Sequence, residues 1–159
     1  MMTTTEQHWM ELAISAAVEG VNSKQGGPFG AVIVRENKLI ASAFNTVTST
    51  LDPTAHAEIN AIRQACRELG TYNLNGCALF SSCEPCPMCM GAILWARISE
   101  LYYCADRLDA EQAGFDDACF YHKLEQGLKD RSTLMTHIAH PQRKRPFELW
   151  LNLDDKELY

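Results

Sequence analysis

Two short segments constrain this chain more than any other feature: His56-Ala57-Glu58 and Cys83-Glu84-Pro85-Cys86-Pro87-Met88-Cys89. One histidine and two cysteines can hold a zinc ion and leave one of its coordination positions open. A carboxylate two residues after the histidine can manage protons at that open position. The fold must therefore bring these two segments, which are far apart in the chain, to one point.

The spacing within each segment predicts that both segments begin a helix. Cys86 and Cys89 are three residues apart, so they share one face of a helix, and the first turn of a helix favours thiolate over thiol. His56 and Glu58 are two residues apart, about 200° around an ideal helix, so they can serve one centre only beyond the helix end. The pair Asp52-Pro53 suits the start of such a helix, because aspartate caps and proline tolerates the first helical position.

Other uses of the cysteines remain open at this point. Cys83-x-x-Cys86-x-x-Cys89 also fits a redox pair with a spare thiol, or a closed structural zinc site with His56 as the fourth ligand. Glu58 and the two prolines favour a catalytic site, because a purely structural site has no use for a carboxylate beside the metal. We interpret Cys83, which precedes the helix, as a packing residue rather than a ligand.

Length and composition indicate one globular domain, 1–159. The chain has 159 residues, of which 47% are hydrophobic, enough for a sizeable core. A formal net charge of −6 argues against a protein that grips nucleic acid and for a small, uncharged substrate. The seven cysteines, an odd number, and the lack of any long apolar run predict a reduced, cytoplasmic protein without a membrane span.

Alternating helix and strand patterns predict a three-layer α/β/α domain. Strands expected at 29–35 and 38–45 form an antiparallel pair, and strands at 77–82 and 98–105, joined by a helix, form a parallel pair. The expected helices cover 3–22, 52–69, 85–97, 109–114 and 146–153, with a loop at 46–51 and a last strand at 134–139. The region 119–130 gives no clear pattern.

His56-Ala57-Glu58 together with Pro85-Cys86-Pro87-Met88-Cys89 makes the chain resemble the cytidine deaminase superfamily. The resemblance implies a five-stranded mixed sheet with helices on both faces. It also implies one zinc ion per chain, held by His56, Cys86 and Cys89. The implied chemistry is hydrolytic deamination of a base, in which hydroxide formed at the zinc attacks while Glu58 shuttles protons.

A narrower branch is indicated by Gly27-Pro28-Phe29-Gly30-Ala31-Val32 and Asp52-Pro53-Thr54-Ala55-His56-Ala57-Glu58, which resemble bacterial guanine deaminases and tRNA adenosine deaminases. Ala113-Gly114-Phe115-Asp116-Asp117 and the terminal Lys156-Glu157-Leu158-Tyr159 resemble the guanine deaminases and not the tRNA enzymes. The implied reaction is conversion of guanine to xanthine and ammonia, with attack at C2. Between 122 and 145 the sequence shows little resemblance.

The resemblance further implies a set of substrate contacts: Phe29 and Trp95 flank the base, Asn45 and Asp117 hydrogen-bond it, and Ala57 lies against it. Asp117 also assists proton movement. The chemistry of guanine suits this set, because O6 and the ring nitrogens accept from an amide while N1–H and the 2-amino group donate to a carboxylate. Ordinary explanations also exist: the aromatic residues as core, Asn45 and Asp117 as turn or cap residues.

The last residue, Tyr159, is implied to close the pocket of a partner subunit, with the C-terminal segment 146–159 crossing over in a homodimer.

Three alternatives to guanine deamination stay open. The first is deamination of another small base or nucleoside, such as cytosine, cytidine or guanosine. The second is tRNA adenosine deamination, which the acidic charge disfavours. The third, of a different class, is a catalytically silent zinc-stabilised binding module, which the intact Glu58 disfavours.

Overall fold

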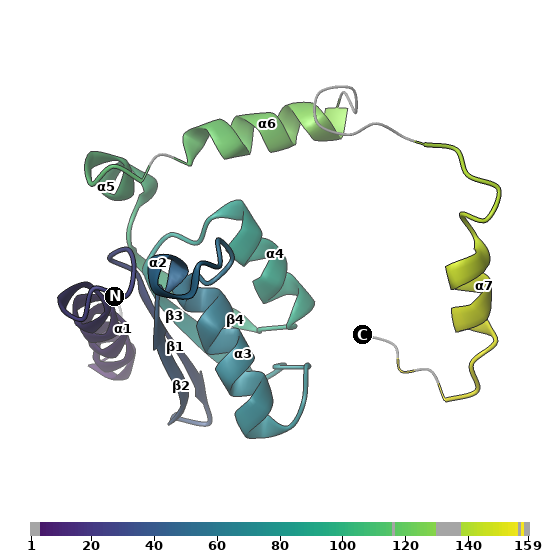
Figure 1. The fold of residues 1–159 in the computed structure, drawn as a ribbon. Helices are drawn as coiled ribbons and strands as arrows, with labels where there is room; N and C mark the ends of the chain where they lie inside the picture. The colour runs from purple at the N-terminus through teal and green to yellow at the C-terminus, as the bar shows by residue number, and fades with distance from the viewer. Residues whose placement is uncertain (1–3, 116, 130–137, 156, 158–159) are drawn as a thin grey trace. The chain divides into compact units, whose positions relative to one another are not determined.

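The computed structural model describes residues 4–115, 117–129, 138–155 and 157 (Figure 1). The chain forms two compact units, Met1–Ala118 and Cys119–Tyr159, each of which is described by itself. The first unit contains the sheet and both segments that carry the predicted metal ligands.

A mixed sheet with strand order β2-β1-β3-β4 forms the middle layer of the first unit. Its strands are β1 (Gly30–Arg35), β2 (Lys38–Phe44), β3 (Cys77–Cys83) and β4 (Glu100–Ala105). β1 pairs antiparallel with β2 and with β3, whereas β3 pairs parallel with β4 through the crossover helix α4 (Pro87–Trp95). The predicted antiparallel and parallel pairs are both confirmed.

The predicted strand count is wrong for the part of the chain that the structure describes, which has four strands and not five. The expected fifth strand at 134–139 lies mostly outside the described residues, and Ile138 and Ala139 are not in a strand. After β4 the described chain continues as helices instead. Asp106 accepts hydrogen bonds from the N–H groups of Leu108 and Asp109 and so starts α5 (Arg107–Gln112) directly after β4 in the chain.

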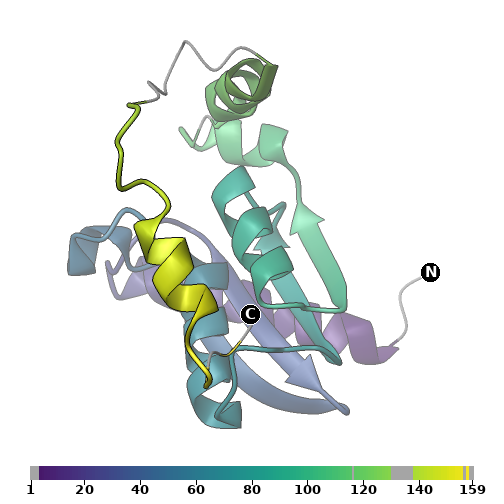
Figure 2. The same cartoon turned by 90° about the vertical axis from the view of Figure 1, so that its right-hand side faces the viewer.

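Helices cover both faces of the sheet, as the three-layer prediction requires (Figures 1 and 2). α1 (Thr4–Asn22) packs on one face, and α3 (Ala57–Leu69), with α4 beside it, packs on the other. Alternate side chains of β1 serve the two cores: Val32 and Val34 pack on the α1 side, Ala31 and Ile33 on the α3 side. Close approach of α3 to the sheet is possible because small residues recur every fourth position on its inner face, namely Ala57, Ala61 and Ala65.

The helix that carries His56 begins later than the sequence predicts. Asp52 does not cap a helix, because its carboxylate accepts from the N–H and the hydroxyl of Thr54 at 2.8 and 2.7 Å and holds a local turn. The predicted loop at 46–51 contains the short helix α2 (Val47–Thr50), and α3 starts only at Ala57, with His56 as its N-cap. Gly70, with φ of 64°, ends α3 as predicted.

The described part of the second unit is helical. α6 (Ala118–Lys129) occupies the region without a clear sequence pattern, and α7 (Arg145–Leu151) confirms the predicted C-terminal helix with slightly earlier bounds. Tyr159 and the side chain of Cys119 lie outside the described residues. Among the described helices, none is both long and apolar enough to cross a membrane.

Candidate metal centre

The three predicted ligands sit at the N-terminal ends of two neighbouring helices. His56 is the N-cap of α3 and Cys86 is the N-cap of α4, both with extended backbone conformation. Pro87 fixes the first helical residue of α4, and Cys89 follows in the same turn. The positive ends of two helix dipoles and their free N–H groups therefore face one point, which favours thiolate ligands.

The donor atoms have the separations that a tetrahedral zinc site needs. His56 Nδ1 lies 3.6 Å from the Sγ atoms of both Cys86 and Cys89, and the three donor atoms lie within 4.8 Å of one another. Zinc bound tetrahedrally, with Zn–N of about 2.0–2.1 Å and Zn–S of about 2.3 Å, holds nitrogen and sulfur ligands about 3.6 Å apart. These residues therefore fit one zinc ion, and with three protein ligands they leave the fourth position open.

The same three side chains form one proton-sharing cluster. A hydrogen bond from the Cys89 thiol lowers the pKa of Cys86 to about 4 despite its burial, and His56 adds to this effect. That bond raises the pKa of Cys89, and the hydrogen bond to Cys86 raises the pKa of His56. The cluster thus prepares one thiolate, and metal binding replaces the shared protons by the ion.

Cys83 stands apart from this cluster, as predicted. Its thiol contacts the carbonyl oxygen of Asp106 at 3.5 Å, and burial raises its pKa to about 11. Among the described residues, the group that could hold a metal ion contains His56, Cys86 and Cys89 without it. A closed four-ligand site of Cys83, Cys86, Cys89 and His56 is therefore not formed.

Glu58 lies beside the ligands in the first turn of α3 and is only 6% exposed. Burial is the largest cause that raises the pKa of its carboxyl, with the negative charge of Cys86 adding to it. Ser81 of β3 donates to Glu58 Oε1 at 3.4 Å. Ser81 is not among the site residues predicted from the sequence. Its signal was a polar residue within the apolar strand segment Cys77–Ser82.

Asn45 is 5% exposed and its side-chain orientation is fixed by the backbone around it. Its Oδ1 accepts from the N–H groups of Gly27 and Val47 at 3.2 and 3.1 Å. A side chain at Gly26 would collide with that same oxygen and with the Asn45 carbonyl, so the chain can pass there only as glycine. Because the oxygen is occupied, the amide N–H₂ is the part of Asn45 that remains to donate to a ligand.

Two further predicted contact residues, Phe29 and Asp117, interact with Asn45 and with the ligand Cys86, respectively. The N–H of Asn45 donates to the carbonyl oxygen of Phe29 at 3.0 Å, and the Phe29 ring packs edge-on against Phe115 with centroids 5.0 Å apart. Asp117 is half-buried. Its burial is the largest cause that raises the pKa of its carboxyl, and the negative charge of Cys86 raises this pKa further. Phe115 was not assigned a role by the sequence analysis, although it lies in the Ala113–Asp117 stretch that carried the resemblance.

The remaining predicted contact residues differ in their placement. Ala57 is fully buried between His56 and Glu58 at the start of α3. Trp95 lies at the far end of α4 from Cys86, is 63% exposed, and has the Arg97 guanidinium carbon 5.9 Å from its ring centroid. Trp95 therefore lies at the other end of α4 from the residues that hold the metal. Tyr159 falls outside the described residues.

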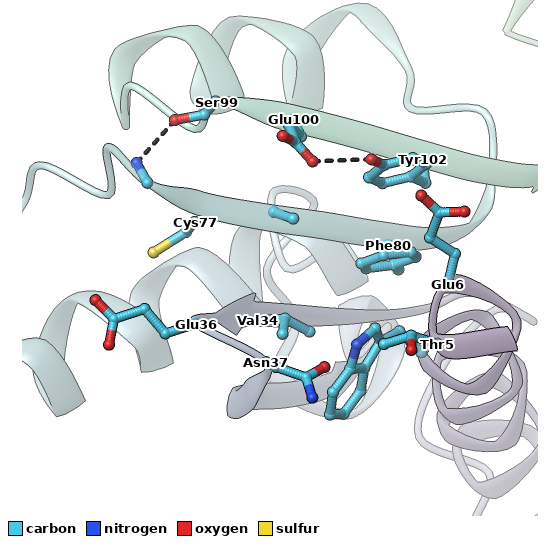
Figure 3. A pocket seen from close by; sticks show the side chains of 13 residues that line it. Thr5, Glu6, Val34, Glu36, Asn37, Cys77, Phe80, Ser99, Glu100 and Tyr102 are labelled. Atoms are coloured by element: carbon cyan, nitrogen blue, oxygen red, sulfur yellow. Dashed lines mark hydrogen bonds between the residues drawn. The ribbon is translucent and has the colours of Figure 1, made fainter. Parts of the chain in front are cut away.

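A separate cavity of about 340 Å³ lies where β3 and β4 begin (Figure 3). The ligands Cys86 and Cys89 follow the other end of β3. Two hydrogen bonds join polar groups in the wall of the cavity: Tyr102 donates to Glu100 at 2.8 Å, and Ser99 accepts from the N–H of Gly76 at 2.7 Å. Phe80 and Tyr102 stack in its wall with centroids 4.6 Å apart. It contains none of the predicted site residues.

Comparisons with known proteins agree with this site. The chain is 46% identical to guanine deaminase of Bacillus subtilis over 95% of its length and 97% of that protein. The crystal structure of the Bacillus subtilis enzyme superimposes with a TM-score of 0.92 at 44% identity, covering 99% of each chain. A guanine deaminase structure from Nitrosomonas europaea matches 73% of this chain and 66% of its own with a TM-score of 0.65 at 31% identity.

More distant similarity extends to RNA-modifying enzymes. The tRNA-specific adenosine deaminase of Aquifex aeolicus is 39% identical over 69% of this chain and 70% of that protein. The zinc-binding region of cytidine and deoxycytidylate deaminases matches residues 3–105, which include both ligand segments. With its His56, Cys86 and Cys89 cluster, the chain belongs to this zinc-binding deaminase family.

Proposed function

We propose that this protein is a guanine deaminase, which hydrolyses guanine with one water molecule to xanthine and ammonia. The observation that carries the choice of substrate is the end-to-end likeness to the Bacillus subtilis guanine deaminase, in sequence and in structure. The likeness to the tRNA enzyme covers a smaller share of the chain. The acidic net charge of −6 also suits a neutral base better than a polyanion.

The chemistry requires a water nucleophile and a leaving amine. Zinc held by His56, Cys86 and Cys89 supplies a Lewis acid that lowers the pKa of water to near neutrality. Glu58 takes the proton from the attacking water and delivers it to the departing amino group, so that ammonia leaves and a carbonyl forms at C2. Burial suits Glu58 to this task, because a carboxyl with a raised pKa holds the proton that it takes more firmly than an exposed carboxyl does before passing it on.

Recognition of the base follows from complementary hydrogen bonding. The free N–H₂ of Asn45 donates to O6 or a ring nitrogen of guanine, and Asp117 accepts from the N1–H edge and assists proton movement. Phe29 flanks the ring, with Phe115 supporting it edge-on. Ala57 lies against the base beside the metal centre. Two observations support these roles: a backbone hydrogen bond joins Asn45 to Phe29, and burial together with the negative charge of Cys86 raises the pKa of Asp117.

We further propose that the active form is a homodimer in which segment 146–159 crosses to the partner subunit and Tyr159 closes its pocket. Leu94 and Trp95, 65% and 63% exposed, form an apolar patch on α4 that a partner would cover. In this assembly Trp95 would flank the base. A reduced cytoplasmic location suits the three-ligand site, which needs its thiols free of disulfides.

The experiment that tests the function is ammonia release by the zinc-loaded protein from guanine, cytosine, cytidine, guanosine and a tRNA anticodon stem-loop. Release from guanine alone is the expected result. Release from a nucleoside or from the RNA without release from guanine would keep the zinc chemistry and overturn the substrate. No release from any of them would favour the binding-module alternative.

A further inference from the structure

Asn60 of α3 is a polar residue that neither the metal centre nor the proposed substrate contacts use. It follows His56 by one helical turn, and its N–H donates to the His56 carbonyl oxygen at 2.9 Å. Its side chain is half-buried and points from the helix toward the chain segment between β2 and α3.

The Asn60 amide nitrogen contacts three oxygen atoms, one from the last residue of β2 and two from that segment. Nδ2 lies 3.0 Å from the Phe44 carbonyl oxygen, 3.0 Å from Thr46 Oγ1 and 3.3 Å from the Ala55 carbonyl oxygen. An amide has two N–H bonds, so at least one of them is shared between two acceptors. Because all three neighbours are oxygen acceptors, the site requires a donor such as an amide N–H₂. A carboxylate there would have no proton to donate and would be repelled by the oxygens.

The three acceptors lie next to Asn45 and His56 in the chain. Phe44 and Thr46 are the two neighbours of Asn45, and Ala55 is the residue before His56. The Thr46 N–H also donates to the Ala55 carbonyl oxygen at 3.0 Å, which closes the loop at its base. One side chain thus joins the residues around the base-binding amide to the residue that precedes the metal ligand.

We propose that Asn60 is a positioning residue that sets the distance between the Asn45 amide and the metal centre, and thereby the affinity for the purine base. It touches neither the substrate nor the metal. The proposal rests on the proposed function insofar as Asn45 binds the base. Because Asn45 contacts the ring edge and not the reacting C2, its displacement weakens ground-state and transition-state binding alike and appears in KM.

The test compares Asn60→Ala and Asn60→Asp with the wild type, and Arg63→Gln serves as the matched control. Arg63 ties the same helix to the outer part of the same loop through Asp52 and Thr54 at 3.5 and 3.4 Å. Loss of the half-buried donor is expected to raise KM for guanine, and the Kd of the analogue 8-azaguanine, by about tenfold or more. The value of kcat is expected to change less, and zinc content to stay at one ion per chain.

Several outcomes would overturn the proposal. Folded, zinc-loaded Asn60 variants with wild-type KM and Kd would do so, as would an equal loss in Arg63→Gln, which would indicate general loop anchoring. If the Asn60 variants fail to fold, Asn60→Gln keeps an amide at this position but moves its nitrogen outward by one methylene group. An unchanged KM in the folded Asn60→Gln variant would also contradict the proposal.

A structural measurement separates this proposal from the assignment of guanine. A crystal structure of Asn60→Ala is expected to show the Asn45 amide displaced relative to His56, Cys86 and Cys89, whichever base the wild type deaminates. An unmoved Asn45 would overturn the positioning role. If the wild type does not act on guanine, the substrate assignment fails, and KM is then measured with the base that it does deaminate.

Discussion

His56 and Cys86 occupy equivalent positions in the fold: each is the extended N-cap residue of its helix, and Nδ1 of one lies 3.6 Å from Sγ of the other. The equivalence explains how two distant segments build one centre. An N-cap side chain projects beyond the helix end, so two neighbouring helices present their caps to the same point. Glu58 and Cys89, in the first turns, then complete the site from the same two helices.

The first prediction concerns the ligand set. Cys86→Ser is expected to reduce zinc content well below one ion per chain, because the serine hydroxyl does not replace a thiolate whose pKa is about 4. The melting temperature should fall with it, since a ligand at a thousand times its Kd stabilises the native state by about 4 kcal/mol. Elemental analysis and calorimetry measure both effects.

The matched control is Cys83→Ser, which changes a neighbouring buried thiol outside the cluster. It should retain the full zinc content even if the melting temperature falls. Zinc loss in this variant equal to that in Cys86→Ser would contradict the ligand assignment.

The second prediction concerns Glu58. Glu58→Gln keeps the volume and the hydrogen bond from Ser81 but removes the group that carries the proton. We expect kcat to fall by about 10²–10⁴-fold with zinc content and fold retained. Ammonia release and elemental analysis check the two parts together. A variant that retains wild-type kcat would remove Glu58 from the mechanism.

Much of this site could be predicted because its signals are local. At the start of a helix, residue spacing determines which side chains face the same point. The spacings of Cys86 and Cys89, and of His56 and Glu58, can therefore be interpreted without knowing the rest of the fold. The start of α3 was predicted too early because Asp52-Pro53 suits a helix start and a turn equally. The hydrogen bonds from Thr54 to the Asp52 carboxylate decide for the turn.

Other features could not be predicted because they depend on contacts across the fold. Asn60 looks like an ordinary polar residue of a helix, and its acceptor Phe44 is 16 positions earlier in the chain. The edge-on packing of Phe115 on Phe29 likewise joins residues from distant segments. The strand expected at 134–139 rested on a short apolar pattern, which is a weak signal without a known partner strand.

The third prediction tests the fixed orientation of Asn45. Gly26→Ala would drive a methyl group into the Asn45 side-chain oxygen and carbonyl, so it should raise KM for guanine about tenfold and destabilise the fold by about 1–3 kcal/mol. A double-mutant cycle with Asn45→Ala provides the control. Because the two changes act on one group, their effects on KM should not add, whereas fully additive effects would separate Gly26 from Asn45.

The fourth prediction tests the crossed C-terminal segment by complementation between subunits. A chain that ends at residue 155 keeps Glu58 but lacks Tyr159, and full-length Glu58→Gln has the reverse defect. Each alone should be almost inactive. If Tyr159 serves the partner's pocket, mixed dimers contain one complete site, and a mixture refolded together should recover about a quarter of the wild-type activity per site.

The pairing of defects makes this result specific. The control is a doubly altered chain, which is truncated and also carries Glu58→Gln. Mixed with the truncated chain or with full-length Glu58→Gln, it should give no recovery, because no pocket then receives both Glu58 and Tyr159. Native mass spectrometry establishes whether mixed dimers form, because the truncated chain is lighter than the full-length chain. Absence of recovery in mixed dimers that do form would contradict the crossing of segment 146–159. A truncated chain with wild-type kcat/KM would leave Tyr159 without a role in catalysis.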